Sequence, residues 1–218
     1  MSFNKFVMSK PRPLPVILLL DVSGSMDGEK IESLNAAVRD MISSFCAVAD
    51  ARGEIHVSVI TFATQASQFI TMTPAKDIQM PALEADGRTS LGAAIGLLNS
   101  ILNDTEQIPP RAYIPTIVLV GDGRPTDEWR MPLDELMGSP RGQKTVRLAM
   151  GIGDDADYSV LKAFVNDEKI GVFKARDARS IKEFFQWVTL SVTSRTASQN
   201  PDEPIFAFDD RDDTKFEF

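Results

Sequence analysis

Apolar runs and amphipathic stretches alternate along this chain. The clearest apolar run covers Val16 to Leu20 and ends at Asp21. It is too short to cross a membrane, and such a run is typical of a central strand buried on both faces of a parallel sheet. The stretch that follows repeats apolar residues at three- and four-residue steps, which indicates one face of a long helix. Its apolar positions are Ile31, Leu34, Val38, Met41, Ile42, Phe45, Val48 and Ala49.

The same alternation of strand and helix patterns continues to the last predicted helix. Strands are predicted from β-branched and aromatic runs, and helices from three- and four-residue periods. Parallel neighbours in a sheet need crossover connections, usually helices. The pattern therefore predicts an α/β fold with a doubly wound, mostly parallel central sheet and helices on both faces. The further predicted strands are 54–62, 68–72 (a candidate edge strand), 114–120, 145–152 and 171–175, and the helices are 89–102, 158–165 and 178–193.

The length and apolar content fit one domain with additional segments. The chain has 218 residues, of which 43% are hydrophobic, enough for one well-buried core but not for two. We expect an N-terminal extension at 1–13, one domain at 14–194 and an acidic C-terminal tail at 195–218. The tail has a net charge of −4 and contains four phenylalanines. Such a segment either docks on a partner or is a frayed end. A related hypothesis is that Asp209, Asp210 or Glu217 binds a metal of its own or a neighbouring molecule.

Charge and cysteine content restrict the environment. With 31 acidic and 23 basic residues the net charge is −8, which disfavours nucleic acid and anionic membranes as partners. Cys46 is the only cysteine, so an internal disulfide is excluded, and its amphipathic setting predicts a small core residue. The N-terminus does not follow a signal-peptide pattern, and no later segment is apolar enough to span a bilayer. We therefore expect a cytoplasmic protein.

Oxygen-bearing side chains follow the predicted strands. Asp21, Ser23 and Ser25 come directly after the first strand, Asp122 follows strand 114–120, and Thr89 opens a helix. A doubly wound sheet brings such strand ends to one edge, where ligands bind. A carboxylate with hydroxyls suits Mg²⁺, Mn²⁺ or Ca²⁺ better than zinc or copper. The sequence thus predicts a site for a hard divalent cation.

Each of these residues also has a purely structural interpretation. Ser25 or Asp27 is a suitable cap for the helix that follows, and Thr89 is a suitable N-cap for its own helix. Asp122 precedes a glycine and fits a turn. Chance placement of all three groups at strand ends is much less expected than any one alone, which favours the metal site.

These segments resemble the von Willebrand factor A domain family. Its metal-ion-dependent adhesion site is written D-x-S-x-S, then a threonine, then an aspartate. Here the motif is Asp21-Val-Ser-Gly-Ser, with Thr89 in Gly-Arg-Thr-Ser and Asp122 in Gly-Asp-Gly, and the resemblance spans roughly 14–193. Within the family, Leu14 to Met26 and the strand Val-Ser-Val-Ile-Thr-Phe at 57–62 are most similar to bacterial TerY-like proteins of tellurium-resistance and stress gene clusters. Many members have Thr or Ser where this chain has Gly121, a loss that we expect to weaken metal binding.

The resemblance implies a ligand set and a function. Ser23, Ser25 and Thr89 would ligate the ion through hydroxyls, and Asp21 and Asp122 directly or through water. The ion that fits best is Mg²⁺, with Mn²⁺ or Ca²⁺ as other candidates. A partner protein would supply an Asp or Glu carboxylate to the open position. This implies a non-enzymatic, metal-dependent protein–protein interaction module in a tellurite-resistance, stress or phage-defence system, with an associated kinase or phosphatase as partner.

Two other functions stay open as alternatives: an Mg²⁺-dependent phosphatase-like hydrolase and a metal-independent structural scaffold. A serine hydrolase and a dinucleotide-binding protein are disfavoured. An Mg²⁺-dependent phosphatase-like hydrolase also starts with an aspartate at a strand end, but it needs a second aspartate two residues on, where this chain has Ser23. A serine hydrolase would need a base, and the only histidine, His56, falls in a predicted strand. The turn at Gly121 is too short for a dinucleotide fingerprint, and Pro125 interrupts it. The second alternative is a metal-independent structural scaffold, which metal-independent partner binding would reveal.

Overall fold

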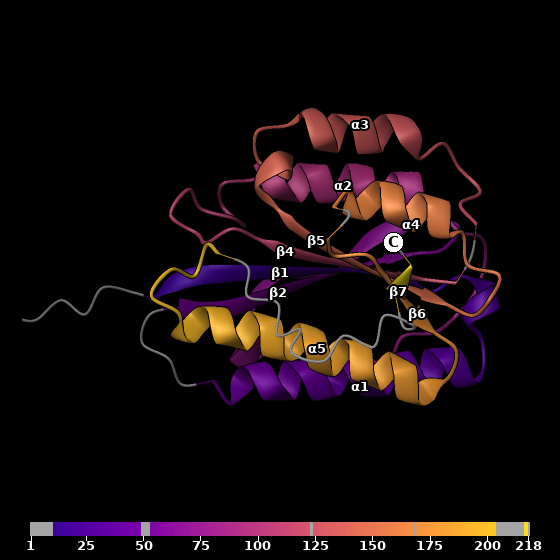
Figure 1. The fold of residues 1–218 in the computed structure, drawn as a ribbon, viewed down its shortest axis with the longest axis horizontal. Helices are drawn as coiled ribbons and strands as arrows, with labels where there is room; N and C mark the ends of the chain where they lie inside the picture. Colours follow the sequence, from indigo (N-terminus) through magenta and orange to yellow (C-terminus); the bar gives the residue numbers. More distant parts are fainter. Residues whose placement is uncertain (1–10, 49–52, 123, 168, 204–215, 218) are drawn as a thin grey trace, which may run out of the picture.

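A seven-stranded sheet forms the middle layer of the molecule (Figure 1). The computed structural model describes residues 11–48, 53–122, 124–167, 169–203 and 216–217. The strand order is β3-β2-β1-β4-β5-β6-β7, and only the edge strands β3 and β7 are antiparallel to their neighbours. The strands are β1 (Arg12–Asp21), β2 (Gly53–Phe62), β3 (Ala66–Pro74), β4 (Thr116–Gly121), β5 (Val146–Ile152), β6 (Val172–Ala175) and β7 (Phe216–Glu217).

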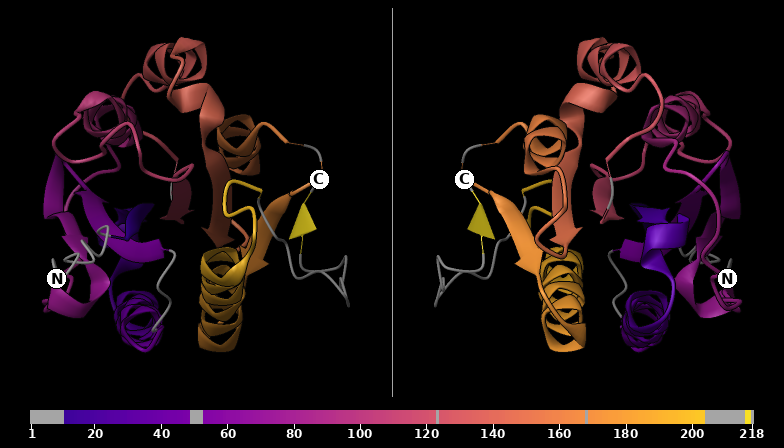
Figure 2. Two further views of the ribbon diagram at one scale, coloured as in Figure 1. Left: turned by 90° about the vertical axis from the view of Figure 1, so that its left-hand side faces the viewer. Right: turned by 90° about the vertical axis from the view of Figure 1, so that its right-hand side faces the viewer.

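Helices cover both faces of this sheet, as Figures 1 and 2 show. One face carries α1 and α5, which pack on each other, and the other carries α2, α3 and α4. The predicted fold class, a doubly wound and mostly parallel sheet with helices on both faces, is confirmed. The helices are α1 (Glu29–Cys46), α2 (Leu91–Asn103), α3 (Arg130–Gly138), α4 (Tyr158–Val165) and α5 (Ala178–Ala197), with 3₁₀ turns at Gly24–Met26, Ala75–Asp77 and Gly142–Lys144.

The central strand β1 is buried along almost its whole length. Its residues from Val16 to Leu20 include five apolar side chains with 0% exposure. Such complete burial follows from its position between β2 and β4, with helices on both faces of the sheet. The strand ends at Asp21, so the sheet interior leads directly to the first candidate ligand.

The sequence pattern missed one helix, α3. It has nine residues and only two fully buried ones, Leu133 and Leu136. Two buried positions, with Met131 64% exposed, give only a weak helical period, and Pro132, which is tolerated in a first turn, resembles a loop signal. The strand predicted at 68–72 is confirmed as an edge strand, and it is longer than predicted.

The prediction that Cys46 is a core residue is wrong. Cys46 is the last residue of α1 and is exposed, with its Sγ 3.1 Å from the carbonyl oxygen of Ala75. The neighbouring Phe45 occupies the inward position of this turn and is 3% exposed. Adjacent residues on a helix point about 100° apart, and Cys46 falls outside the buried stripe that Val38, Met41, Ile42 and Phe45 form.

The last helix runs past the predicted domain boundary at 194. Arg195 lies inside α5 and is 2% exposed. Its guanidinium donates to the carbonyl oxygens of Pro201 (2.8 Å) and Ile114 (2.7 Å) and to Thr116 Oγ1 (2.7 Å). Burial lowers the pKa of Arg195 to about 10, partly offset by Asp202. Arg195 therefore joins the end of α5 to the start of β4 rather than belonging to a tail.

Residues 204–215 and 218 of the predicted tail lie outside the described residues. The hypothesis that its aspartates dock on a partner therefore stays a prediction. In the part of the chain that the structure describes, no helix combines the length and apolar character needed to cross a membrane.

Replacing Arg195 with leucine is expected to destabilise the fold by about 2–4 kcal/mol, because buried oxygen acceptors lose their donors. The free energy of unfolding in urea measures this effect. Arg179→Leu is the matched control on the same helix, since its side chain is 86% exposed and pairs with Glu183 at 3.0 Å on the surface. Similar losses in the two variants would contradict the role assigned to Arg195.

Candidate metal site at the carboxyl ends of β1 and β4

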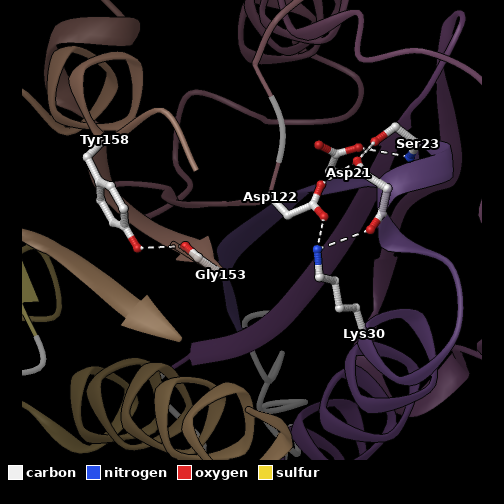
Figure 3. Close-up of polar contacts among 7 residues, drawn as sticks. Asp21, Ser23, Lys30, Asp122, Gly153 and Tyr158 are labelled. Atoms are coloured by element: carbon white, nitrogen blue, oxygen red, sulfur yellow. Dashed lines mark hydrogen bonds and ion pairs between the residues drawn. The ribbon is translucent and has the colours of Figure 1, made fainter. Parts of the chain in front are cut away.

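Two neighbouring strands bring carboxylates to one edge of the sheet. β1 and β4 are parallel, with Leu20 opposite Val120. Asp21 is the last residue of β1, and Asp122 directly follows β4. Both residues are buried, at 1% and 4% exposure. Figure 3 shows their side chains converging with Ser23 and Lys30.

Hydrogen bonds link these carboxylates through the two serines. The backbone N–H of Ser23 donates to Asp21 Oδ1 (2.8 Å). The hydroxyl oxygens of Ser23 and Ser25 lie 3.0 Å apart, and the Ser25 hydroxyl donates to Asp122 Oδ1 (2.7 Å). The second oxygen of Asp21, Oδ2, is buried and has no hydrogen-bond partner within the described residues. Oxygen atoms from two loops thus form one cluster, and one buried anionic oxygen remains unpaired there.

The loop after β1 is held from both sides. Met26, at the end of the 3₁₀ turn, is 0% exposed and anchors the loop in the core. The N–H of Val22 donates to the carbonyl of Phe62 (3.0 Å), and the N–H of Gly24 donates to the carbonyl of Gly87 (3.0 Å). The ends of β1 and β2 and the loop before α2 therefore form one unit.

The loop that carries Thr89 joins the other two loops. Gly87 has φ +81°, and a Cβ there would lie 2.3 Å from Thr64 Oγ1, so the turn requires glycine. Thr89 is 7% exposed, and its carbonyl accepts from the N–H of Thr126 (2.8 Å) in the loop after β4. The structure therefore brings the loops of Asp21, Thr89 and Asp122 together, as the sequence predicted.

The structural interpretation of these residues as helix caps is wrong. The N-cap of α1 is Gly28 and that of α2 is Ser90, and neither helix has a side-chain cap hydrogen bond from its N-cap. Ser25 and Asp27 precede the cap of α1, and Thr89 precedes the cap of α2. The hydroxyl of Ser25 is directed at Asp122 instead.

Asp127 is a site-supporting residue that the sequence did not reveal. Its carboxylate accepts from the N–H groups of Gly92 (3.0 Å) and Ala93 (2.9 Å) at the start of α2. It acts as the cap of a helix that begins more than thirty residues earlier in the chain. A long-range cap leaves no local sequence signal. The contact fixes the loop after β4 against the start of α2.

Lys30 is a second residue that the sequence did not point to. It lies in the first turn of α1, and its ammonium forms an ion pair with Asp122 Oδ2 and donates to the carbonyl of Ser25 (3.1 Å) (Figure 3). The side chain of Asp122 is 1% exposed and that of Lys30 is 39% exposed. The cluster of oxygens therefore includes one positive charge at its solvent side.

Burial changes the acidity of Asp21. Its pKa is raised from 3.8 to about 6, chiefly by burial and further by the nearby Asp122 carboxylate, while hydrogen bonds from Ser23 oppose the shift. Gly121 lies directly against this side chain, since a Cβ at Gly121 would come 3.2 Å from Asp21 Oδ2. A side chain at this position, where the chain departs from the family pattern, would therefore crowd the unpaired oxygen.

The donor set fits a hard cation. Within the described residues, no three His, Cys, Asp or Glu side chains gather in one place, so a cation here would depend on hydroxyls together with Asp21 and Asp122. An unpaired buried carboxylate oxygen is suited to an ion with oxygen ligands. Ser25 is exposed, so the cluster is open to solvent on that side.

His56 lies away from this cluster, as predicted for a strand residue. Its side chain is 18% exposed, and its Nε2 lies 3.0 Å from Glu54 Oε2. In the β1–β2 register His56 is opposite Pro15, whereas Asp21 is opposite Phe62. Six strand residues correspond to about 20 Å. The only histidine therefore does not serve as a base at the site.

The fold and the oxygen cluster define a class of protein. It is a doubly wound α/β domain with a solvent-accessible oxygen-donor site at the carboxyl ends of its central parallel strands. The von Willebrand factor type A domain model matches residues 16–187, and the chain belongs to this family. A curated relative is human inter-alpha-trypsin inhibitor heavy chain H6, 30% identical over 174 residues, covering 70% of this chain. The chain spans only 13% of the length of that relative.

Solved structures share the fold. A von Willebrand factor type A protein from Catenulispora acidiphila matches 83% of this chain and 42% of its own, with a TM-score of 0.64 and 20% identity. Proximal thread matrix protein 1 from the mussel byssus, solved with a zinc-occupied MIDAS motif, matches 84% of this chain and 48% of its own, with a TM-score of 0.65 and 14% identity. At these identities the likeness supports the fold alone.

The raised pKa of Asp21 predicts a specific pH dependence of stability in chelator-treated protein. The folded state holds this proton more tightly than the unfolded state, so stability falls as the pH rises from about 4 through about 6. Asp21→Asn removes this titration. Between pH 4 and pH 7 the wild type should lose about 1–3 kcal/mol relative to the variant, measured by urea unfolding. A difference that stays constant with pH would contradict the burial effect.

Proposed function

We propose that this domain is a metal-dependent protein-binding module with a metal-ion-dependent adhesion site. The proposed ligands are Asp21, Ser23, Ser25, Thr89 and Asp122. The supporting observation is that the Ser25 hydroxyl caps no helix but bonds to a buried Asp122, beside an unpaired Asp21 oxygen. Two buried carboxylates side by side are unfavourable for the fold alone, and a bound cation would offset that cost.

The charge balance of the proposed site explains how it would bind a partner. Hydroxyl ligands are neutral, so two carboxylates would only just balance a divalent cation, and the ammonium of Lys30 would add one positive charge beside it. A carboxylate from an Asp or Glu of a partner protein then gains a charge-assisted contact at the open position. All donors are oxygens, which favours Mg²⁺, with Mn²⁺ and Ca²⁺ as other candidates.

The side chains support a binding role over a hydrolytic one. A phosphatase of the type considered above needs an acid/base carboxylate at Ser23, whose hydroxyl instead lies 3.0 Å from that of Ser25. A serine hydrolase needs a base, and His56 lies toward the far end of β2. We therefore propose a non-enzymatic domain.

The cellular setting is proposed from the sequence resemblance. Leu14 to Met26 and residues 57–62 resemble TerY-like proteins, which supports a cytoplasmic role in tellurite resistance, stress response or phage defence. A kinase or phosphatase from the same gene cluster is the proposed partner. Nucleic acid and membranes are not proposed partners, because the net charge is −8.

The ligand assignment predicts that Asp21→Asn weakens Mg²⁺ and Mn²⁺ binding at least tenfold, because an anionic ligand is lost. Isothermal titration into chelator-treated protein measures the affinity, with circular dichroism to confirm the fold. Asp86→Asn is the matched control, since Asp86 is exposed in the neighbouring loop and should bind metal as the wild type does. Equal affinity in Asp21→Asn and the wild type would reject the assignment.

Partner binding should depend on the same metal. Pull-down of the kinase or phosphatase encoded nearby should succeed with Mg²⁺ and fail with EDTA or with Asp21→Asn, because the bridging cation is missing. Capture that is indifferent to EDTA and to Asp21→Asn would favour the scaffold alternative. Mg²⁺-dependent release of phosphate from p-nitrophenyl phosphate that is lost in Asp21→Asn would favour the hydrolase alternative.

A further inference from the structure

Lys30 places a positive charge inside the cluster of proposed metal ligands. Its ammonium pairs with Asp122 Oδ2 and donates to the carbonyl of Ser25 (3.1 Å), while the other oxygen of Asp122 accepts from the Ser25 hydroxyl (2.7 Å). Every oxygen of the Asp122 carboxylate therefore has a partner, in contrast to Asp21 Oδ2. The ammonium of Lys30 is therefore paired with the Asp122 carboxylate, which a divalent cation would need as a ligand.

The net charge of the cluster depends on this lysine. Asp21 and Asp122 in their ionised forms, with the ammonium of Lys30, carry one net negative charge. A divalent cation converts this to one net positive charge, and a carboxylate from outside then makes the complex neutral. Without Lys30 the two aspartates and the cation are already neutral, and an added carboxylate leaves an excess negative charge. Close charges in a partly buried site are weakly screened, so this balance affects affinity.

We propose that Lys30 is a built-in counter-ion that competes with the divalent cation for Asp122 and makes cation binding depend on an incoming carboxylate. This inference rests on the proposed function of the site. The side chain of Lys30 is 39% exposed, and its flexible four-carbon stem allows the ammonium to move toward solvent when a cation enters. There it remains close enough to the rim to attract the carboxylate of the partner.

The test measures Mn²⁺ affinity by isothermal titration, with and without sodium acetate as the carboxylate probe and with ionic strength matched by chloride. Lys30→Gln should bind Mn²⁺ at least tenfold more tightly than the wild type without acetate. Acetate should strengthen Mn²⁺ binding by the wild type more than by Lys30→Gln. Lys30→Arg keeps the charge and should behave as the wild type does.

Arg39→Gln is the matched control. It removes one positive charge from an exposed position on the same helix, about 13 Å further along the axis, and should leave Mn²⁺ affinity unchanged. Thermal melting in chelator gives a readout without metal. Lys30→Gln should melt below Arg39→Gln, because the buried aspartates lose their counter-ion, and it should gain more from added Mn²⁺.

The outcomes separate this inference from the proposed function. If Lys30→Gln binds Mn²⁺ no more tightly than the wild type, the competition is overturned while the site assignment stands. If Lys30→Gln folds only with Mn²⁺ present, the counter-ion role is supported. If neither protein binds Mn²⁺ in a manner sensitive to Asp21→Asn, with or without acetate, the proposed function itself fails.

Discussion

The parallel pairing of β1 with β4 is the constraint on which the whole site depends. The register places Val16 opposite Thr116 and Leu20 opposite Val120, so both strands end within one residue of each other at the same edge. Side chains alternate along a strand, and a slip of one residue would turn Asp21 to the opposite face of the sheet. The fully buried aliphatic residues of β1 that fix this register therefore also position the chemistry.

Burying two carboxylates side by side is unfavourable, and the surrounding loops offset that cost. The backbone N–H of Ser23 and the hydroxyl of Ser25 donate to them, and Lys30 supplies a counter-charge. The loops themselves are fixed by backbone hydrogen bonds between segments far apart in sequence and by Asp127 at the start of α2. The side chains of the site are thus positioned by contacts among several loops rather than by any single loop.

The sequence predicted the features that have a local signal. Strand β1 was predictable because its apolar run is continuous. The close grouping of Asp21, Ser23 and Ser25 was predictable because they fall within five residues. Their meeting with the loops of Thr89 and Asp122 followed from the topology of a doubly wound sheet. The family predicted from the resemblance is the one whose model matches residues 16–187.

The features that were missed depend on contacts between distant segments or on helix ends. Asp127 and Lys30 acquire their roles only when the loops assemble, and Arg195 only when α5 meets β4. The error at Cys46 has a related cause. The periodicity extended the helix to residue 49, whereas α1 ends at Cys46, and at a helix end the period alone does not decide which side chain faces the core.

The exposed thiol of Cys46 has a practical consequence. Helix α1 starts beside the oxygen cluster with Lys30 in its first turn, and Cys46 ends it sixteen residues later, about 24 Å along the axis. Because Cys46 is the only cysteine, maleimide chemistry would attach the protein to a sensor surface at a single point remote from the strand ends. Every immobilised molecule would then present the carboxyl ends of β1 and β4, with the oxygen cluster, to the solution.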